Sequence, residues 1–498
     1  MLSRLEKSIL NYINNQKQYP VIAAIAAGLY SLIYTYDSNF TLVNSVSQFF
    51  VIVGIYIVIP VIVFVVSKQI VDRISFLKKY QTYLIPMLNA SFFAFFLAGR
   101  IYGFHQRKIL LLCIVVSVLI AMLLRKHYKK IIVLQYIVAI VAFVSLLPLL
   151  INFFTHSNQW MEQPDHISEV QFKTHPNIYV LQPDGYVNFS ELGKGYYKHE
   201  NSGFVRYLQE KNFKLYDDYR SNYASTILSN SSLFAMKHHY IKKDESRSGI
   251  FGARKIAAGE NPIIPILKKN DYKTFLVLEY PYLLLNRPTI LYDECNITDN
   301  EIPWLGMGAF KHQKELIKPL EETIQNNKAT HNFYFVEKIA PSHIATQKRF
   351  STGIDGERQI YLDKLEKANE WLVEIINMIT ENDPNSLIVI TADHGGYVGM
   401  EYTKQIETKL TDRDLVYSAF SSALAIKWPN NTAPSYDKQL KTPVNLFRVL
   451  FTYLSEDETL LKHLEEDTSY SVVKKDAPTG IYKYIDKDGN VVFKKLED

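Results

Sequence analysis

The sequence predicts an N-terminal α-helical membrane bundle of about five spans, followed by an α/β domain with a mostly parallel central sheet. Two observations indicate this class. Long apolar runs recur before residue 155, each near the roughly 17–25 residues that cross a bilayer. After residue 175, continuous apolar runs of strand length alternate with helical patterns, which is typical of parallel strands joined by helices. We expect a bundle at 1–155, a linker at 156–175, the α/β domain at 176–470 and a tail with a β-hairpin at 471–498.

The distribution of charge divides the chain at the same place. The first 155 residues hold fourteen Lys and Arg but only three acids, Glu6, Asp37 and Asp72, which gives a net charge of +11. The remainder holds 41 Lys and Arg against 47 Asp and Glu, a net charge of −6. A basic, apolar segment is typical of a membrane part. A mildly acidic domain lacks the basic patch that nucleic acid requires. We therefore expect a membrane as a partner and no nucleic acid.

Five apolar stretches are the expected spans, and the first is the weakest: 20–36, 44–67, 82–99, 109–124 and 131–153. Buried helices of a soluble protein are the alternative, but the lengths and the charged boundaries favour spans. Clusters of Lys and Arg precede the first span and follow the second and the fourth. The loop after the third span is a mild exception, with Arg100, Arg107 and Lys108. By the positive-inside rule the N-terminus is then cytoplasmic. An odd number of spans would make this a multi-pass inner-membrane protein with an extracytoplasmic (periplasmic) α/β domain.

Runs of strand length predict the central sheet at 177–182, 213–219, 273–278, 332–337, 387–391 and 419–426. Helical patterns lie between them, the clearest at 357–381 and another at 443–455. The tail GIYKYIDKDGNVVF is typical of a hairpin that turns on Asp488 and Gly489. The two cysteines, Cys113 and Cys295, lie in different parts of the chain, so no intrachain disulfide is expected.

Two predicted strands end in residues that can bind a metal. Asp184 follows the first strand, and Asp393-His394 follows the strand LIVIT. Ligands of open α/β sheets bind just beyond the carboxyl ends of strands, so these side chains could converge on one cation. Carboxylates with an imidazole favour zinc or manganese over calcium. The alternative for Asp184 is an ordinary turn residue before Gly185. For Asp393-His394 a turn is the weaker interpretation, because the paired glycines that follow would let the backbone pack close to an ion.

The stretch RSNYASTILSNSSLFAM, residues 220–236, is rich in hydroxyls and is expected to open a helix near Thr226. A Ser or Thr at that place is by default an N-cap. The alternative is a nucleophile, because a divalent ion beside the hydroxyl would lower its pKa and the helix N-terminus would stabilise the negative charge. Position alone does not separate capping from catalysis.

PDGY after a strand, SNYASTILSNSSLFAM and LIVITADHGG together resemble the alkaline phosphatase superfamily. More narrowly the sequence is similar to its membrane-anchored sulfatase-like branch, which includes lipoteichoic acid synthases and phosphoethanolamine transferases. The similarity runs from about residue 175 to 455 and includes TPVNLFRVLFTYL. It implies that the α/β domain is an alkaline-phosphatase-like, sulfatase-like catalytic domain.

The resemblance also implies roles by position. It makes Thr226 the catalytic nucleophile, with Ser225 in reserve, and His343 a substrate-binding or phosphate-binding residue. A surface loop is the alternative for His343. The metal ligands that it implies are Asp184, Thr226, Asp393 and His394.

Two departures from the superfamily narrow the function. Sulfatases need a Cys or Ser that is converted to formylglycine and followed closely by Pro and Arg, and nothing similar stands at 221–232. The next histidine after His394 is His463, so one divalent metal ion is expected rather than two. The segment His238-His239-Tyr240 could be a metal site, but its tandem histidines are expected to be solvated.

The resemblance therefore implies a membrane-bound, metal-dependent transferase. It would move a phospho-headgroup from a phospholipid donor through Thr226 to a glycan or glycolipid acceptor of the envelope. The first alternative is a phosphodiesterase or phosphatase that uses water as the acceptor. The second is a catalytically inactive envelope protein that only binds. The headgroup, the acceptor and the identity of the metal stay open at this point.

Overall fold

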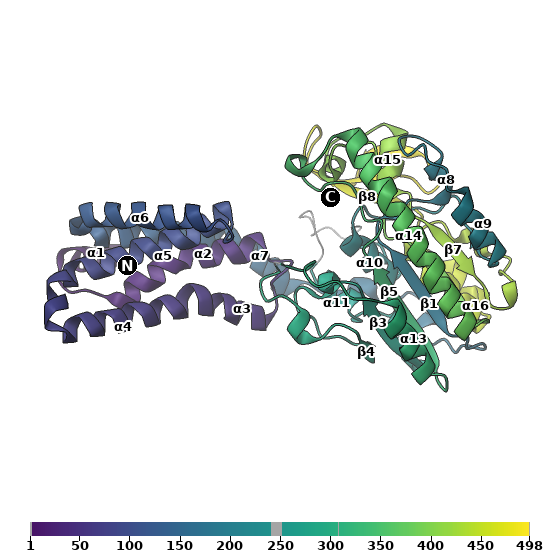
Figure 1. Cartoon of the computed structure of the whole chain (residues 1–498), viewed down its shortest axis with the longest axis horizontal. Coiled ribbons are helices and arrows are strands. Elements are labelled where there is room, and N and C mark those ends of the chain that lie inside the picture. The colour runs from purple at the N-terminus through teal and green to yellow at the C-terminus, as the bar shows by residue number, and fades with distance from the viewer. Residues whose placement is uncertain (1, 241–250, 307, 498) are drawn as a thin grey trace. The chain divides into compact units, whose positions relative to one another are not determined.

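The computed structural model describes residues 2–240, 251–306 and 308–497 (Figure 1). The chain forms two compact units. One comprises Met1–His156 with Trp304–Met307, and the other comprises Ser157–Pro303 with Gly308–Asp498.

The first unit is a bundle of apolar helices. They are α1 (Leu2–Asn14), α2 (Pro20–Ser38), α3 (Val46–Val53), a π-helical turn (Gly54–Val58), α4 (Ile59–Arg73), α5 (Gln81–Tyr102), α6 (Arg107–Leu123) and α7 (Tyr128–Thr155). In the described part of the chain, four continuous helices are long and apolar enough to cross a membrane: Pro20–Ser38, Val46–Arg73, Ser75–Tyr102 and Arg125–Thr155. The fourth expected span is α6, which has only 17 residues. The membrane bundle is thus confirmed, and the number of spans is four or five.

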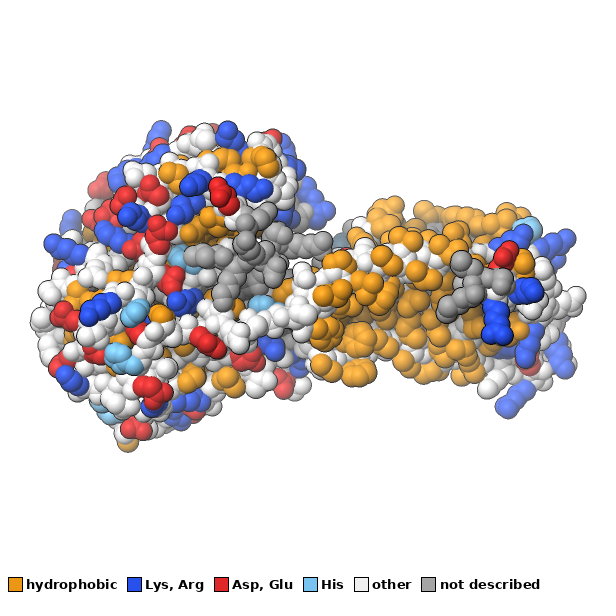
Figure 2. Space-filling view, turned by 180° about the vertical axis from the view of Figure 1, so that it is seen from behind, with side chains coloured by type: hydrophobic (Ala, Val, Ile, Leu, Met, Phe, Trp, Pro, Cys, Tyr) orange, Lys and Arg blue, Asp and Glu red, His pale blue; other side chains and the backbone are white. Residues whose placement is uncertain are grey.

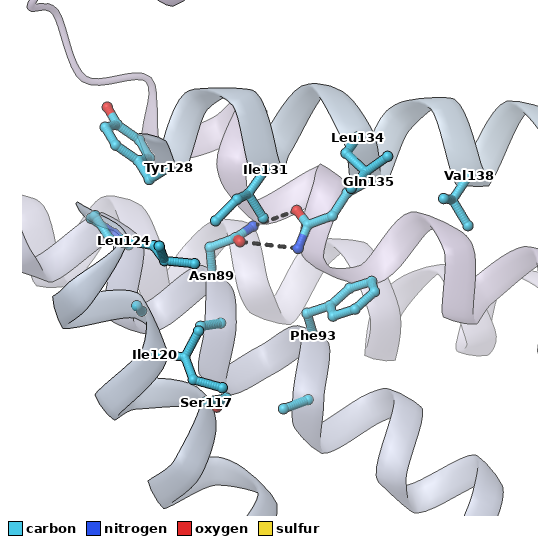
Figure 3. A pocket seen from close by; sticks show the side chains of 14 residues that line it. Asn89, Phe93, Ser117, Ile120, Leu124, Tyr128, Ile131, Leu134, Gln135 and Val138 are labelled. Carbon is cyan, nitrogen blue, oxygen red and sulfur yellow. Dashed lines mark hydrogen bonds between the residues drawn. The ribbon is translucent and has the colours of Figure 1, made fainter. Parts of the chain in front are cut away.

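The surface of the bundle is apolar along its length, with Lys and Arg gathered at one end (Figure 2). A pocket of about 270 Å³ lies between α5, α6 and α7 and opens to the surface of the bundle (Figure 3). Asn89 and Gln135 line this pocket and bind each other through both amides, at 2.9 and 3.0 Å. The Asn89 amide also donates to the carbonyl of Ala23 at 2.8 Å. Polar groups inside a membrane bundle need such partners, because no water is available there.

The second unit is built on a seven-stranded sheet in the order β2-β7-β6-β1-β5-β3-β4. Its strands are β1 (Ile178–Pro183), β2 (Lys214–Leu215), β3 (Tyr272–Leu278), β4 (Glu294–Cys295), β5 (His331–Lys338), β6 (Leu387–Thr391) and β7 (Leu424–Lys427). The pairs β6-β1, β1-β5, β5-β3 and β3-β4 are parallel, and only β7 runs antiparallel to its neighbours. The mostly parallel α/β sheet is therefore confirmed.

Helices cover both faces of this sheet. One apolar core joins it to α10 (Thr226–Ala235), α11 (Ala253–Ala257), α12 (Ile263–Lys269) and α16 (Leu446–Ser455). The other joins it to α9 (Ser202–Glu210), α13 (Ile317–Asn326), α14 (Ile354–Asn382) and α15 (Arg413–Phe420). Alternate residues of β1 serve the two cores: Ile178 and Val180 face the first, and Tyr179 and Leu181 the second. This burial on both sides explains why the strands are continuous apolar runs.

Two expected strands are shorter than their apolar runs. In the run 213–219, only Lys214–Leu215 pairs with β7, because a turn at Asp217-Asp218 ends the strand. In the run 419–426, α15 continues to Phe420 and the strand begins only at Leu424. A second, three-stranded antiparallel sheet holds β8 (Ser469–Val473), β9 (Gly480–Ile485) and β10 (Val491–Lys495). The turn between β9 and β10 contains Asp488 and Gly489, and Gly489 has a φ of +88°.

Candidate active site

Asp184 and Asp393 meet because their strands are neighbours. β1 and β6 run parallel, with Leu181 opposite Ile390, so both strands end at the same edge of the sheet. Just beyond that edge, the backbone amide of Gly185 donates to Oδ1 of Asp393 at 2.9 Å. Both carboxylates are buried. The structure thus brings the two predicted acids together at the carboxyl edge of the sheet, where open α/β sheets bind ligands.

Gly185 permits the turn that follows β1. Its φ is +68°, and a Cβ there would lie 2.2 Å from the carbonyl oxygen of Ser342. The buried hydroxyl of Tyr361, on α14, donates to the carbonyl of Gly185 at 2.9 Å and accepts from the amide of Val187 at 3.2 Å. The hydroxyl of Tyr361 and the carbonyl of Ser342 therefore fix the loop that carries Asp184, and no residue larger than glycine fits at position 185.

Thr226 is the first residue of α10, and its hydroxyl points at the carboxylates. Its Oγ1 donates to Oδ2 of Asp184 at 2.9 Å and lies 3.4 Å from Nε2 of His394. Ser225 occupies the N-cap position, but its side chain makes no capping hydrogen bond. Neither residue therefore caps the helix with its hydroxyl, and the Thr226 hydroxyl is directed into the cluster of acids.

The remaining polar residues of α10 hold the helix in place. Asn230, one turn after Thr226, exchanges two amide hydrogen bonds with Gln182 of β1, at 2.7 and 2.9 Å. The hydroxyls of Ser229, Ser231 and Ser232 donate to backbone carbonyls at 2.6 to 2.9 Å. These serines are therefore structural, and the pair Gln182–Asn230 fixes the distance between the helix and the strand that carries Asp184.

His394 directs its ring nitrogen Nε2 at the same cluster. Its Nδ1 lies 2.8 Å from the carbonyl oxygen of Gly395, which can only accept, so Nδ1 carries the proton. Nε2 then faces Asp393 Oδ2 at 3.4 Å. The glycine after it packs tightly, since a Cβ on Gly395 would come within 2.3 Å of the carbonyl of Ser418. Gly395 thus allows close packing against α15, and Gly396 allows close packing against the ring of Tyr361 on α14.

The residues present fit a divalent cation. The ligand atoms of Asp184, Asp393 and His394 lie within 4.8 Å of one another. In addition, Asp184 Oδ1 and Asp393 Oδ2 are buried and have no hydrogen-bond partner among the residues that the structure describes. Burial and the neighbouring Asp184 raise the pKa of Asp393. Burial lowers the pKa of His394, but the two carboxylates outweigh it and the net pKa is raised. The cluster is therefore short of positive charge, which a cation bound by these atoms would supply.

His343 lies beside this cluster. Its ring is centred 5.9 Å from the ring of His394, and its Nδ1 lies 2.6 Å from the carbonyl oxygen of Ile344. Burial, together with His394, lowers the pKa of His343 to about 4, so the imidazole is neutral at pH 7. The loop that carries it follows β5, and the residue is only partly exposed. His343 therefore lies on a loop beside the cluster, and its role in binding substrate stays a prediction.

The structure also corrects the expectation for the tandem histidines and adds a residue. His238 and His239 are buried rather than solvated, and the ring of His239 stacks on Tyr223 at 3.9 Å. Their nitrogens meet the carbonyls of Glu466 and Leu228, so they pack a core. The residue that the sequence did not indicate is Glu337, which is fully buried at the end of β5. Within NFYFVE it is only the polar end of a strand.

Comparison with known proteins gives the family of the chain. The sulfatase family model matches residues 188–455, more than half of the chain. No curated protein matches the sequence. Solved structures with a similar fold include the C-terminal periplasmic domain of EcEptC from Escherichia coli, with 13% identity, a TM-score of 0.40, and coverage of 62% of this chain and 93% of that one. A zinc complex of that domain has 14% identity, a TM-score of 0.40 and coverage of 63% and 93%. The lipoteichoic acid synthase LtaP from Listeria monocytogenes has 14% identity, a TM-score of 0.40 and coverage of 67% and 91%.

Proposed function

Because the chain belongs to the sulfatase family, and is thus a sulfatase-like transferase or hydrolase of the alkaline phosphatase superfamily, we propose that Thr226 carries a phospho-headgroup between two substrates. The donor is a phospholipid and the acceptor a hydroxyl of an envelope glycan or glycolipid. The apolar helical bundle holds the enzyme in the membrane in which the donor and the released diacylglycerol dissolve.

The orientation of the Thr226 hydroxyl is the observation that supports this proposal most. An alcohol is a weak nucleophile, and its proton has to leave for it to attack. Here the hydroxyl donates to Asp184 at 2.9 Å and sits at the N-terminus of α10, where backbone amides favour negative charge. The N-cap position belongs to Ser225, whose side chain makes no capping hydrogen bond, so the hydroxyl of Thr226 is directed at Asp184 and not at the backbone amides of the helix.

The reaction follows from the positions of these groups. Oγ1 of Thr226 attacks phosphorus, the bond from phosphorus to the diacylglycerol oxygen breaks, and that oxygen takes up a proton. The acceptor hydroxyl then attacks the phosphothreonine, its proton leaves, and Thr226 regains one. A divalent ion held by Asp184, Asp393 and His394 would lower the pKa of the hydroxyl and stabilise charge on the phosphoryl oxygens. His343, with its ring 5.9 Å from that of His394, is close enough to contact a phosphoryl group held there.

The choice of phosphate over sulfate esters follows from the nucleophile. The family's sulfatases use a formylglycine made from Cys or Ser, whereas the hydroxyl that points into this cluster is a threonine. Threonine cannot be converted into that aldehyde, so an ordinary alkoxide attack on phosphorus is the chemistry we propose.

The full-length protein, purified in lipid nanodiscs with Zn²⁺ or Mn²⁺, tests the proposal. Incubation with phospholipids labelled in the headgroup should release diacylglycerol, and mass spectrometry should find the headgroup phosphate on the peptide that contains Thr226. Addition of an acceptor glycan should then transfer the headgroup phosphate from Thr226 to the glycan. Transfer to water alone would show that the protein is a hydrolase. Absence of both diacylglycerol release and a Thr226 adduct with every donor would contradict the proposal.

A further inference from the structure

The pocket between α5, α6 and α7 is a feature of the membrane bundle that the proposed reaction does not use (Figure 3). None of the described residues that line it is charged, and most are aliphatic or aromatic. Three lining residues, Ile120, Leu124 and Leu134, are between 43% and 58% exposed, so the pocket opens to the surface that faces lipid. An apolar hollow that opens toward a bilayer suits a hydrocarbon chain.

The pocket forms because α6 and α7 pack on different helices. α6 packs along α5, whereas α7 packs on α2. The amides of Asn89 and Gln135 join α5 to α7, and Asn89 also donates to the carbonyl of Ala23 on α2 at 2.8 Å. The two buried amides thus find their partners within the bundle, as polar groups in a membrane must. An occupant of the pocket therefore needs no polar group of its own at this depth.

The pocket has the depth of one leaflet of a bilayer. It begins at Tyr128, the first residue of α7, and reaches Val138, about 15 Å further along the helix axis. Half of the hydrocarbon core of a bilayer is also about 15 Å thick. α7 ends only at Thr155, about 25 Å beyond Val138. The pocket is therefore confined to one half of the bundle, and a chain inside it would come from the leaflet on that side.

The mouth of the pocket in this half of the bundle is basic. Residues 124–131 hold four Lys and Arg and no acid. One of them, Lys129, is buried and donates to the carbonyl of Asn15 at 2.7 Å. Lys126 and Lys130 are exposed, and neither has an ion-pair partner among the residues that the structure describes. Exposed lysines at the level of the headgroups attract anionic phospholipids.

We propose that the pocket holds an acyl chain of one anionic phospholipid, whose headgroup lies against Lys126 and Lys130. The chain fills the space between α6 and α7 and thereby attaches α6 to the helix that follows it. This lipid is a structural ligand and not the donor of the proposed reaction. The proposal is independent of the proposed function, because neither the pocket nor the two lysines take part in that reaction.

Photolabelling of the full-length protein in detergent micelles tests the acyl-chain site. The probe is phosphatidylglycerol that carries a diazirine near the end of one acyl chain. We expect mass spectrometry to find the label on the segments of α5, α6 and α7 that line the pocket. Ala90→Trp places an indole in the pocket and should remove this label. Val141→Trp, the matched control on the exposed surface of α7, should keep it.

Competition by unlabelled lipids tests the headgroup. Phosphatidylglycerol should compete for the label about fivefold to thirtyfold better than phosphatidylcholine with the same acyl chains, the effect of one or two lysines near the headgroup. Lys126→Gln combined with Lys130→Gln should remove this preference and keep the label. Arg4→Gln combined with Lys7→Gln, which removes the same charge from α1, should leave the preference unchanged.

Several results would overturn the proposal. Equal competition by the two lipids in the wild type would refute the anionic headgroup, and this result needs no variant. Label that stays on the pocket segments in a folded Ala90→Trp protein, or that never appears there in the wild type, would refute the acyl-chain site. A disulfide-linked dimer of Leu134→Cys in a Cys113→Ser background would show that a second copy of the chain covers the opening instead.

Discussion

The direction of one hydroxyl separates two interpretations of Thr226 that its position in the sequence leaves open. A capping hydroxyl accepts a hydrogen bond from a backbone amide, whereas that of Thr226 donates to the Asp184 carboxylate at 2.9 Å. Its contribution to stability is then one side-chain hydrogen bond to a charged group, about 1.5–3 kcal/mol. Its proposed contribution to catalysis is the covalent bond itself, which no neighbouring group can replace.

Thr226→Ala should therefore abolish headgroup release while lowering the melting temperature by only a few degrees. Thr226→Ser should keep measurable activity, because the attacking oxygen remains. Ser225→Ala is the matched control and should change neither property, since the Ser225 side chain makes no capping bond. The paired measurement is thermal melting and turnover of a chromogenic phosphodiester. Near-normal turnover by a folded Thr226→Ala protein would exclude the nucleophile.

The metal ligands give a second prediction at the scale of residues. Asp393→Ala combined with His394→Ala removes one buried carboxylate and one imidazole, leaving only Asp184 of the three groups. We expect the purified variant to lose its stoichiometric Zn²⁺ or Mn²⁺ in elemental analysis. The control is His239→Ala, a buried histidine that packs on Tyr223 outside the cluster, which should keep the metal. Equal metal content in the double variant and the wild type would show that the ion binds elsewhere.

Single residues differ in how well the sequence indicates them. Asp184 and Asp393-His394 could be predicted because parallel strands bring their carboxyl ends to one edge, whatever the rest of the fold. Glu337 could not, because an acid at the end of an apolar strand is ordinary until the structure shows that neither oxygen has a partner. The burial of His238 and His239 could not be predicted from the sequence either, because it depends on packing against Tyr223 from the preceding loop.

At the scale of elements, the site depends on how α10 is attached to the sheet. Two hydrogen bonds between the amides of Gln182 and Asn230 attach the helix to β1. Asn230 lies one helical turn after Thr226. The strand runs were predictable from their apolar composition, but their ends were not. In the run 419–426, for example, the helix α15 continues to Phe420 and the strand β7 begins only at Leu424, although composition alone assigns the whole run to a strand. Helix and strand compete for such short apolar segments, and tertiary packing decides between them.

Removing one amide of the pair should lower stability and activity together. Asn230→Leu leaves the buried amide of Gln182 without a partner, which costs about 1–3 kcal/mol. It also frees α10 to shift, so we expect turnover to fall more than the folded fraction explains. In Gln182→Leu with Asn230→Leu no buried amide is left unpaired, and much of the stability should return. Chemical unfolding and turnover of the three variants form a double-mutant cycle, and strictly additive losses would exclude the coupling.

At the scale of the whole molecule, the mechanism requires that the α/β domain and the lipid donor share one side of the membrane. Charge was informative here, because the net charge of +11 before residue 156 marks the membrane part. The number of spans was less predictable. Helix α6 has 17 residues, at the lower limit for crossing a bilayer, and composition alone does not decide whether it crosses.

Reporter fusions decide this topology. If α6 crosses, five spans with a cytoplasmic N-terminus place Asp498 outside the cytoplasm, and a reporter that is active only there should be active when fused after it. Fusions in the loops on either side of α6, after Gly103 and after Lys126, should then report opposite sides. If α6 does not cross, both loops lie on one side and the positive-inside rule applied to four spans puts the α/β domain in the cytoplasm. Activity of a cytoplasm-only reporter after Asp498 would therefore contradict both the five spans and a reaction with donors on the outer face.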